Sequence, residues 1–317
     1  MTKELEDKIK AAEQTLRLAA EMSAYYYHKP LILCYSGGKD SDVMLDIAKG
    51  CLRPDQFEVL NSHTTVDAPE TVYHIREVFK ELEAEGIHTE VRMPRYKGQP
   101  TSMWRLIEAK HMPPTRQIRY CCEVLKETAT PNRMVAVGVR EDESKGRKGR
   151  DSFFVKGRKK DDAEFRSTQH TYAMFKLDQM EQDTYECKMI EACKKNKDTI
   201  CNPIYKFTEQ DIWEYARVRN IKMNPLYERG YKRIGCIGCP LSNPKNIKKE
   251  FQDYPKYKEN YIKAFDRMLK SLKDRDGNIR TQKWRNGNDA FLWWIGEDPN
   301  QIKIDDLIPR DNGGDDT

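Results

Sequence analysis

Six consecutive residues, Ser36-Gly37-Gly38-Lys39-Asp40-Ser41, bring together two glycines, a lysine and two hydroxyl groups. They follow the apolar run LILC that begins at Leu31, and they precede a stretch from Asp42 to Lys49 with a helical pattern. Two glycines let backbone N–H groups converge on phosphate oxygens, and a helix N-terminus adds partial positive charge. A strand, a glycine-rich turn and a helix in this order predict a nucleotide phosphate site.

The same four residues, Gly-Gly-Lys-Asp, also occur in ordinary surface turns, but the apolar run before them and the helix after them favour a phosphate site. The pattern is not a Walker A motif, which needs four residues between its glycines and a Gly-Lys-Ser/Thr ending. It resembles the PP-loop of the adenine nucleotide alpha hydrolase superfamily, whose members react at the α-phosphorus. This resemblance implies that Ser36 and Ser41 donate hydroxyls, Lys39 contacts phosphate, and Asp40 organises the turn or a Mg²⁺ ion.

The composition excludes a membrane span. Charged residues make up 34% of the 317 residues and hydrophobic ones 38%, and no apolar run approaches the roughly 18 residues that a span requires. The first residues, MTKELEDKIK, are too acidic and polar for a signal peptide. We therefore expect a cytoplasmic protein with one main domain and an appended lobe.

Positive charge is concentrated in one segment, although the net charge of +5 is modest. Between Lys145 and Lys160, eight of sixteen residues are Lys or Arg, and two adjacent phenylalanines lie among them. Such a segment suits an arm that grips a nucleic-acid backbone. A solvated insertion has the same composition, so both interpretations stay open.

The nine cysteines, in a chain without a secretion signal, indicate thiols or metal ligands and not a disulfide framework. Cys121 and Cys122 are adjacent, and Cys236 and Cys239 form a C-x-x-C motif. Two neighbouring thiolates strain a single tetrahedral zinc but reach two irons of a cuboidal cluster, which favours [4Fe–4S]. Zinc, a redox disulfide, or no metal remain the alternatives. The other cysteines are expected to be structural: Cys34, Cys51, Cys187, Cys193 and Cys201.

Hydrophobic periodicity predicts the elements that position these groups. Helices are expected from Leu5 to about Tyr27, over 70–85 and 103–110, and from Glu209 with Thr208 as its N-cap. Strands are expected over 57–65, 88–93 and 133–139, and from Cys201 onward. Strands that alternate with helices predict an α/β fold with a mostly parallel sheet, whose ligands lie beyond the carboxyl ends of the strands.

Most of the chain resembles, in order, the phosphoadenosine phosphosulfate (PAPS) reductase family, including its adenylyl sulfate reductase branch. The segments that carry the resemblance are SGGKDS, HTTVDAPET from His63, RYCCEVLK from Arg119, VGVREDES from Val137, and the stretch from Cys201 to Pro240. The resemblance implies a doubly wound, mostly parallel sheet, adenine nucleotide alpha hydrolase-like, with a helical C-terminal lobe. The expected parts are an N-terminal helix over 1–27, the PP-loop domain over 28–245 with a basic insertion over 142–162, and the lobe over 246–317, which ends in a disordered acidic tail.

The resemblance also implies the site residues. Those expected to bind an adenine nucleotide, ATP or PAPS, are Tyr35, Ser36, Gly37, Gly38, Lys39, Asp40, Ser41, Thr64 and Gly138. Catalytic roles fall on Lys39, Asp40 and Arg140. The anion-binding set is Arg116, Arg119, Lys126, Arg140, Glu143 and Ser144, and the [4Fe–4S] ligands are Cys121, Cys122, Cys236 and Cys239. Mg²⁺ is expected to bridge phosphate oxygens.

Three departures from the family pattern indicate a changed substrate. Reductases carry a C-terminal Glu-Cys-Gly-x-His segment whose cysteine attacks the sulfate sulfur, and here no cysteine follows Cys239. His63 and Thr65 replace an acid and a glycine, and Ala68 replaces an aromatic residue. We expect an enzyme that cleaves ATP to AMP and pyrophosphate and activates an acceptor for sulfur transfer, as in DNA phosphorothioation. A sulfur-donor or partner protein is then expected.

Two other functions remain open. One is a PAPS or adenylyl sulfate reductase, or a sulfotransferase, that uses a partner's thiol. The other is a non-catalytic nucleotide sensor. The sequence identifies neither the acceptor nor the oligomeric state.

Overall fold

The computed structural model describes residues 1–127, 130, 133–143, 190–193, 198–272 and 284–297. The chain forms two compact units, and each is built from separate segments of the sequence. Unit 1 comprises residues 1–100 and 122–236, and unit 2 comprises residues 101–121 and 237–317. The domain boundaries expected from the sequence stay predictions.

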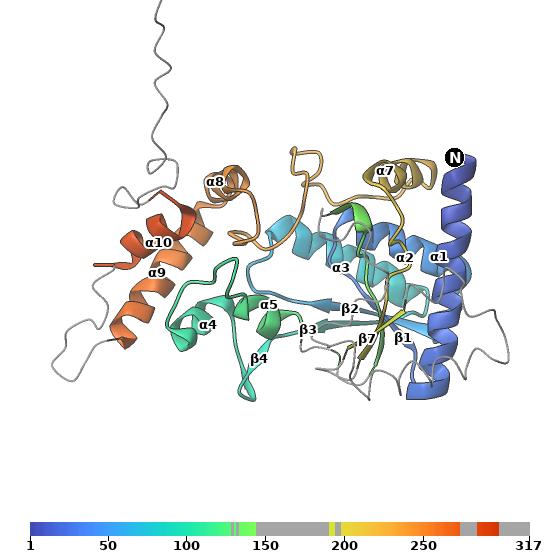
Figure 1. The fold of residues 1–317 in the computed structure, drawn as a ribbon, viewed down its shortest axis with the longest axis horizontal. Helices are drawn as coiled ribbons and strands as arrows, with labels where there is room; N and C mark the ends of the chain where they lie inside the picture. Colours follow the sequence, from blue (N-terminus) through green and yellow to red (C-terminus); the bar gives the residue numbers. More distant parts are fainter. Residues whose placement is uncertain (128–129, 131–132, 144–189, 194–197, 273–283, 298–317) are drawn as a thin grey trace, which may run out of the picture. The chain divides into compact units, whose positions relative to one another are not determined.

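A six-stranded sheet forms the centre of unit 1 (Figure 1). Its strand order is β3-β2-β1-β6-β8-β7, with bounds β1 Leu31–Cys34, β2 Phe57–Ser62, β3 His88–Arg92, β6 Met134–Ala136, β7 Ile190–Cys193 and β8 Asp198–Cys201. Every neighbouring pair is parallel except β7 and β8, which are antiparallel. The order reverses at β1, since β2 and β3 lie on one side of it and β6 lies on the other. The expected doubly wound, mostly parallel α/β fold is therefore confirmed.

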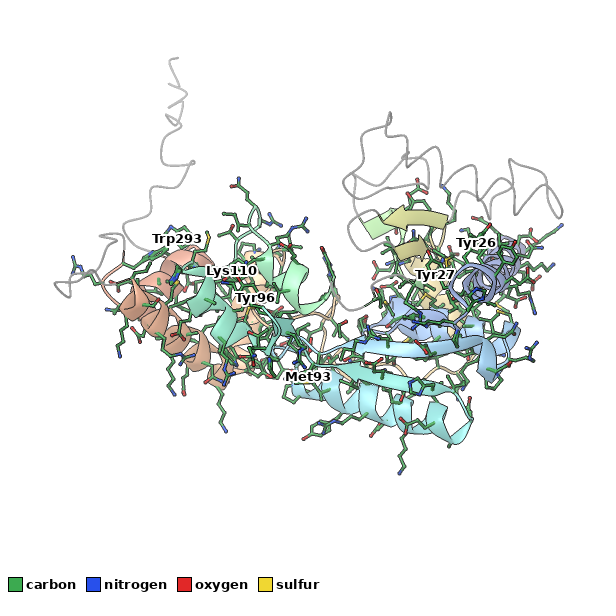
Figure 2. The ribbon with its side chains drawn as sticks, turned by 90° about the horizontal axis from the view of Figure 1, so that it is seen from below. Tyr26, Tyr27, Met93, Tyr96, Lys110 and Trp293 are labelled. Atoms are coloured by element: carbon green, nitrogen blue, oxygen red, sulfur yellow. The ribbon has the colours of Figure 1, made fainter. Side chains whose placement is uncertain are left out.

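The helices of unit 1 are α1 Lys3–Met22, α2 Lys39–Cys51, α3 Pro69–Ala84 and α7 Glu209–Val218. The buried residues of these helices form one core with every second residue of the strands. Leu16, Leu33 and Val59 of this core are at most 1% exposed. A π-helical turn, Ser23–Tyr27, follows α1, and its Tyr26 and Tyr27 pack against this core (Figure 2). A smaller cluster of Ile32, Leu60 and Val135 uses the intervening strand positions. Short elements complete the unit: the 3-10 turns Pro54–Gln56 and Glu141–Glu143, and the hairpin β4 Arg95–Tyr96 with β5 Gln99–Pro100.

Unit 2 is helical and has an aromatic core. Its helices are α4 Met103–Lys110, α8 Pro244–Asp253, α9 Pro255–Ser271 and α10 Gly287–Ile295; α5, Tyr120–Leu125, contains the boundary between the units. The fully buried Tyr261 of α9 lies 4.9 Å from Trp104 and 4.7 Å from Trp294, measured between ring centroids. Its hydroxyl donates to the carbonyl of Ile237 at 2.9 Å. The helical lobe expected from the sequence therefore has its own packed interior.

Most elements match the sequence expectation, including α4, whose bounds are those expected, and α7, whose Thr208 cap accepts from the N–H of Asp211 at 3.1 Å. One prediction was wrong: Cys201 ends strand β8 and does not open a strand. The chain turns directly after it because Asn202 and Pro203 cannot extend a central ladder. No helix among the described residues is long and apolar enough to cross a bilayer.

Candidate phosphate-binding site

The turn between β1 and α2 needs glycine at position 37. Gly37 has φ of +70°, and a Cβ there would lie 2.8 Å from Cγ1 of Ile75 on α3. A side chain is excluded both by the left-handed backbone and by this contact. The turn therefore passes close to α3 and enters α2 through Gly38, whose backbone is extended with φ of −105°.

The hydroxyl of Ser41 holds this turn together. Its Oγ donates to the carbonyl of Gly38 at 2.8 Å and accepts from the N–H groups of Gly38 at 3.2 Å and Ser36 at 3.3 Å. Oγ of Ser36 lies 3.2 Å from it, and Ser36 is itself exposed. Ser41 thus shapes the loop, while the hydroxyl of Ser36 is at the surface.

Lys39 is the buried cation of the loop. Its residue is only 5% exposed, and its Nζ lies 3.5 Å from Oδ2 of Asp40 and 3.9 Å from Oε1 of Glu209. Glu209 opens α7, which packs beside α2 (Figure 1). Both ion pairs are long, so the attraction between Lys39 and each carboxylate is weaker than in a close pair.

Arg140 is paired with the loop through Asp40. Nε of Arg140 donates to Oδ1 of Asp40 at 2.5 Å, and its guanidinium also faces the carbonyl of Phe207 at 3.5 Å and Asp142 at 3.8 Å. Arg140 is 3% exposed. These contacts place it as a residue that holds Asp40 in position.

The close approach of Gly138 makes that pairing possible. A Cβ at Gly138 would lie 3.3 Å from the backbone of Asp40 and 3.4 Å from the N of Ser41. Because Gly138 follows β6, the neighbour of β1 at the point where the strand order reverses, the loop lies at the position where doubly wound sheets bind ligands.

Two residues that follow α7, Asn224 and Tyr227, form hydrogen bonds to the loop, and we call this pair the clamp. Asn224, fully buried, donates from Nδ2 to the carbonyl of Gly37 at 2.9 Å and to Oγ1 of Thr71 at 3.1 Å. Three residues later, Oη of Tyr227 accepts from the N–H of Lys39 at 2.8 Å. The clamp thus reaches both the carbonyl side of the turn and the first amide of α2.

Tyr35 lies directly before the loop, and its buried side chain contacts residues of α2 and α3. Its hydroxyl donates to Oδ1 of Asp42, which lies 3.2 Å from Nε2 of His74. All three residues are at most 5% exposed, and Oδ2 of Asp42 has no partner in the described part of the chain. Burial, followed by the neighbouring Asp42 carboxylate, raises the pKa of Tyr35 well above its usual range. This network joins β1, α2 and α3 beneath the loop.

Thr64, also expected at the nucleotide, is 1% exposed and contacts the C-x-x-C motif instead. Its Oγ1 accepts from Sγ of Cys236 at 3.5 Å and from the N–H of Val66 at 3.3 Å. Cys236 also forms a β-bridge with Asp67. The HTTVDAPET segment therefore supports the backbone at the first cysteine of the motif.

The four expected cluster ligands are divided between the units: Cys122 and Cys236 belong to unit 1, and Cys121 and Cys239 to unit 2. Thiolates suit an iron–sulfur cluster chemically. Among the described residues, however, no group of three or more His, Cys, Asp or Glu side chains is arranged to hold a metal ion. The cluster stays a prediction.

The expected anion-binding residues belong to both units. Arg140 lies at the loop and Lys126 is exposed in unit 1, whereas Arg116 and Arg119 are exposed in unit 2. Arg116 donates to the carbonyl of Leu241 at 3.2 Å. Glu143 ends a 3-10 turn. Ser144 and nearly all of the basic insertion lie outside the described residues.

Sequence reasoning missed three residues of this site: Glu209, Asn224 and Tyr227. Glu209 has the usual character of an acidic residue in the first turn of a helix, which gives no signal of a partner in another element. Asn224 and Tyr227 occur within the stretch whose resemblance to the family was noted, but Asn-Pro-Leu-Tyr is ordinary turn chemistry. Only their folded positions identify them.

A family model and a curated relative both match most of the chain. The family model described as the phosphoadenosine phosphosulfate reductase domain matches residues 30–242. An uncharacterised protein of Methanocaldococcus jannaschii is 24% identical over 266 residues, which are 81% of this chain and 46% of that protein. The chain thus spans about half the length of this curated relative.

Two further similarities are more limited. An adenosine 5'-phosphosulfate reductase of Burkholderia cepacia is 45% identical over 38 residues, 12% of this chain and 15% of the reductase. The crystal structure of a PAPS reductase from Candida auris in a phosphate complex aligns with a TM-score of 0.43 and 15% identity, covering 74% of this chain and 96% of that one.

Proposed function

The chain belongs to the phosphoadenosine phosphosulfate reductase domain family, and from that premise we propose that its loop at Ser36–Ser41 binds the phosphates of an adenine nucleotide. The observation that carries this proposal is the buried Lys39 at the N-terminus of α2, beside the glycine turn. A helix N-terminus and a desolvated ammonium attract the same anion. ATP is the proposed nucleotide, and PAPS is the alternative.

The proposed reaction is cleavage of ATP between its α and β phosphates. A nucleophile on the acceptor attacks the α-phosphorus, the bond to the bridging oxygen breaks, and pyrophosphate leaves with the electron pair. Lys39 and the N-terminal amides of α2 stabilise the charge that develops on pyrophosphate. Asp40 is the residue that would hold a Mg²⁺ ion bound with the nucleotide, and the ion would neutralise part of the phosphate charge.

The carboxylates around the loop have complementary roles in this proposal. Asp40 is held by Nε of Arg140 at 2.5 Å, which fixes it beside Lys39. Glu209, 3.9 Å from Nζ of Lys39, compensates the ammonium when no nucleotide is bound. Displacing Glu209 exposes the full charge of Lys39 to the phosphates, which strengthens their attraction.

The activated acceptor would then receive sulfur, and a nucleic acid is the acceptor we favour, as in DNA phosphorothioation. The composition of the basic insertion supports this choice, because lysines and arginines match a phosphate backbone. A [4Fe–4S] cluster on Cys121, Cys122, Cys236 and Cys239 belongs to the same proposal, and a partner protein would donate the sulfur.

One experiment tests the reaction. Anaerobically purified protein is incubated with ATP labelled at either the α or the γ phosphate, with and without DNA or tRNA. We expect ATP labelled at the α phosphate to give labelled AMP or an AMP adduct. We expect ATP labelled at the γ phosphate to give labelled pyrophosphate. Release of ADP and inorganic phosphate would contradict cleavage at the α-phosphorus.

A reductase or sulfotransferase acting on PAPS or adenylyl sulfate is the second candidate, and the short identity with an adenosine 5'-phosphosulfate reductase favours it over the sensor. It requires a thiol that attacks the sulfate sulfur. Sulfite released from PAPS with added thioredoxin would support it. Tight ATP binding without turnover would instead support a nucleotide sensor.

A further inference from the structure

Tyr227 occupies a place where a bound phosphate would be expected to accept a hydrogen bond. The N–H of Lys39 is among the first amides of α2, and such amides lack a carbonyl acceptor within their own helix. Here the acceptor is Oη of Tyr227 at 2.8 Å. The hydroxyl therefore stands at the positive end of the helix.

The hydrogen of this hydroxyl is not used by the rest of the site. A tyrosine hydroxyl both accepts and donates. Within the described part of the chain, the hydroxyl accepts from the amide of Lys39, and no described group accepts its hydrogen. Burial raises the pKa of Tyr227, so the hydroxyl keeps its hydrogen throughout the neutral range.

The ring that carries this hydroxyl is fixed in position. It packs edge-on against Trp213 with 5.2 Å between centroids, and Nζ of Lys39 lies 5.9 Å from its centre. Its backbone belongs to turns closed by Tyr227 N to the Asn224 carbonyl at 3.1 Å and by Gly230 N to the Tyr227 carbonyl at 3.0 Å. Asn224 is in turn anchored to Gly37. The position of the ring is thus tied to the loop through Asn224 and the amide of Lys39.

We propose that Tyr227 is a phosphate-binding residue that relays the amide of Lys39: the N–H donates to Oη, and the O–H donates to an oxygen of the nucleotide's polyphosphate. This inference rests on the proposed nucleotide site. A hydroxyl that accepts from an amide at a helix N-terminus is polarised into a better donor. In this relay the donor to phosphate is the O–H of Tyr227, which lies one hydroxyl group further from the helix than the N–H of Lys39. It lies on the same part of the loop as the ammonium of Lys39.

Tyr227→Phe tests the relay because it removes only the hydroxyl and keeps the ring against Trp213. Affinities for ATP, inorganic pyrophosphate and adenosine are measured by calorimetry. Loss of a hydrogen bond to a charged group weakens binding of ATP and pyrophosphate by about 10- to 100-fold. Affinity for adenosine, which has no phosphate, stays within about twofold.

The matched control is Tyr215→Phe, which removes a tyrosine hydroxyl that donates to Oδ2 of Asp46 at 2.8 Å, away from the loop. It leaves the affinity for pyrophosphate unchanged. Unaltered or tighter pyrophosphate binding by Tyr227→Phe overturns the relay alone, and tighter binding identifies the hydroxyl as a competitor of phosphate. Failure of the unaltered protein to bind ATP or pyrophosphate overturns the relay and the proposed nucleotide site together.

Discussion

Asn224 donates to the carbonyl oxygen of Gly37 at 2.9 Å, although 187 residues separate the two in sequence. Both residues are buried, so the phosphate turn keeps its shape through a bond that solvent does not weaken. The shape of the loop therefore depends on the segment that follows α7.

Replacing Asn224 with Ala is expected to destabilise unit 1 by about 1–3 kcal/mol, because it leaves the buried carbonyl of Gly37 without a donor. Urea unfolding followed by circular dichroism measures the change. Lys222→Ala is the control: Lys222 lies two residues from Asn224, the substitution removes an exposed ion pair with Glu77, and it is expected to cost much less. Equal effects of the two substitutions would contradict a structural role for the Asn224 amide.

Lys39→Ala is expected to weaken ATP binding by about one to two powers of ten, since a charge-assisted contact contributes roughly 1.5–3 kcal/mol. Calorimetric titration with ATP and PAPS provides the measurement. Lys49→Ala removes the same charge from the last turn of α2, where Lys49 pairs with Glu85, and it should leave binding unaltered. If Lys39→Ala kept its affinity for both nucleotides, the assignment of the loop would be wrong.

The cluster prediction is tested on protein purified without oxygen. It should be brown and contain about four irons and four sulfides per chain, as a cubane requires. Cys236→Ser combined with Cys239→Ser should remove the colour and the iron, whereas Cys34→Ser, at the end of β1, should retain both. Stoichiometric zinc without iron in the anaerobic protein would count against the cluster.

Glu250 is expected to make the stability of unit 2 depend on pH. Burial raises its pKa to about 7, while the N–H of Gly238, which donates to Oε2 at 2.7 Å, acts in the opposite direction. Because the pKa in the folded chain is above the usual value of 4.5, the folded state favours the protonated carboxyl. The contribution of Glu250 to the free energy of unfolding is therefore complete below about pH 4.5 and is lost as the pH rises through 7. The free energy of unfolding falls by on the order of 1–3 kcal/mol over this range.

Glu250→Gln removes this titration, so its unfolding free energy should vary less than that of the unaltered protein between pH 5 and pH 8. Tryptophan fluorescence during urea unfolding is a suitable probe, because four of the five tryptophans belong to unit 2. Glu259→Gln, at an exposed position of α9, serves as the control and should retain the full pH dependence. Identical pH profiles for Glu250→Gln and the unaltered protein would refute the assignment.

The basic insertion is expected to make nucleic-acid binding depend steeply on salt. Replacing Arg147, Lys148, Arg158 and Lys159 with Ala should reduce the slope of log affinity against log salt. The reduction should correspond to the loss of up to about four phosphate contacts. Anisotropy titrations with DNA and tRNA measure it, while ATP binding should persist. The control replaces four exposed lysines of α8 and α9: Lys245, Lys248, Lys256 and Lys263. Absence of binding at any salt concentration would favour a small-molecule acceptor.

The fold and the glycine turn before α2 were predictable because their signals are contiguous in sequence, while phosphate binding by this turn stays a prediction. Gly37, Lys39 and Ser41 lie within five residues, although Ser41, expected to donate to phosphate, donates to the carbonyl of Gly38. The roles of Asn224 and Tyr227 were not predictable, because both residues act through tertiary contacts. A turn residue has the same local sequence pattern whether or not it makes such contacts. Tyr35 illustrates the same limit: the family resemblance implied a nucleotide contact, but its hydroxyl donates to Asp42 of α2.

The discontinuous path of unit 2 has a consequence for synthesis on the ribosome. Trp104 on α4 packs against Tyr261 on α9, which is translated more than 150 residues later. At about 5–20 residues per second, the apolar face of α4 waits roughly ten to thirty seconds for its partner. Throughout that interval the nascent chain exposes Trp104, Leu106 and Ile107, a hydrophobic surface of the kind that holding chaperones recognise. Efficient production of this protein is therefore expected to depend on chaperone supply more than that of a chain whose units are continuous.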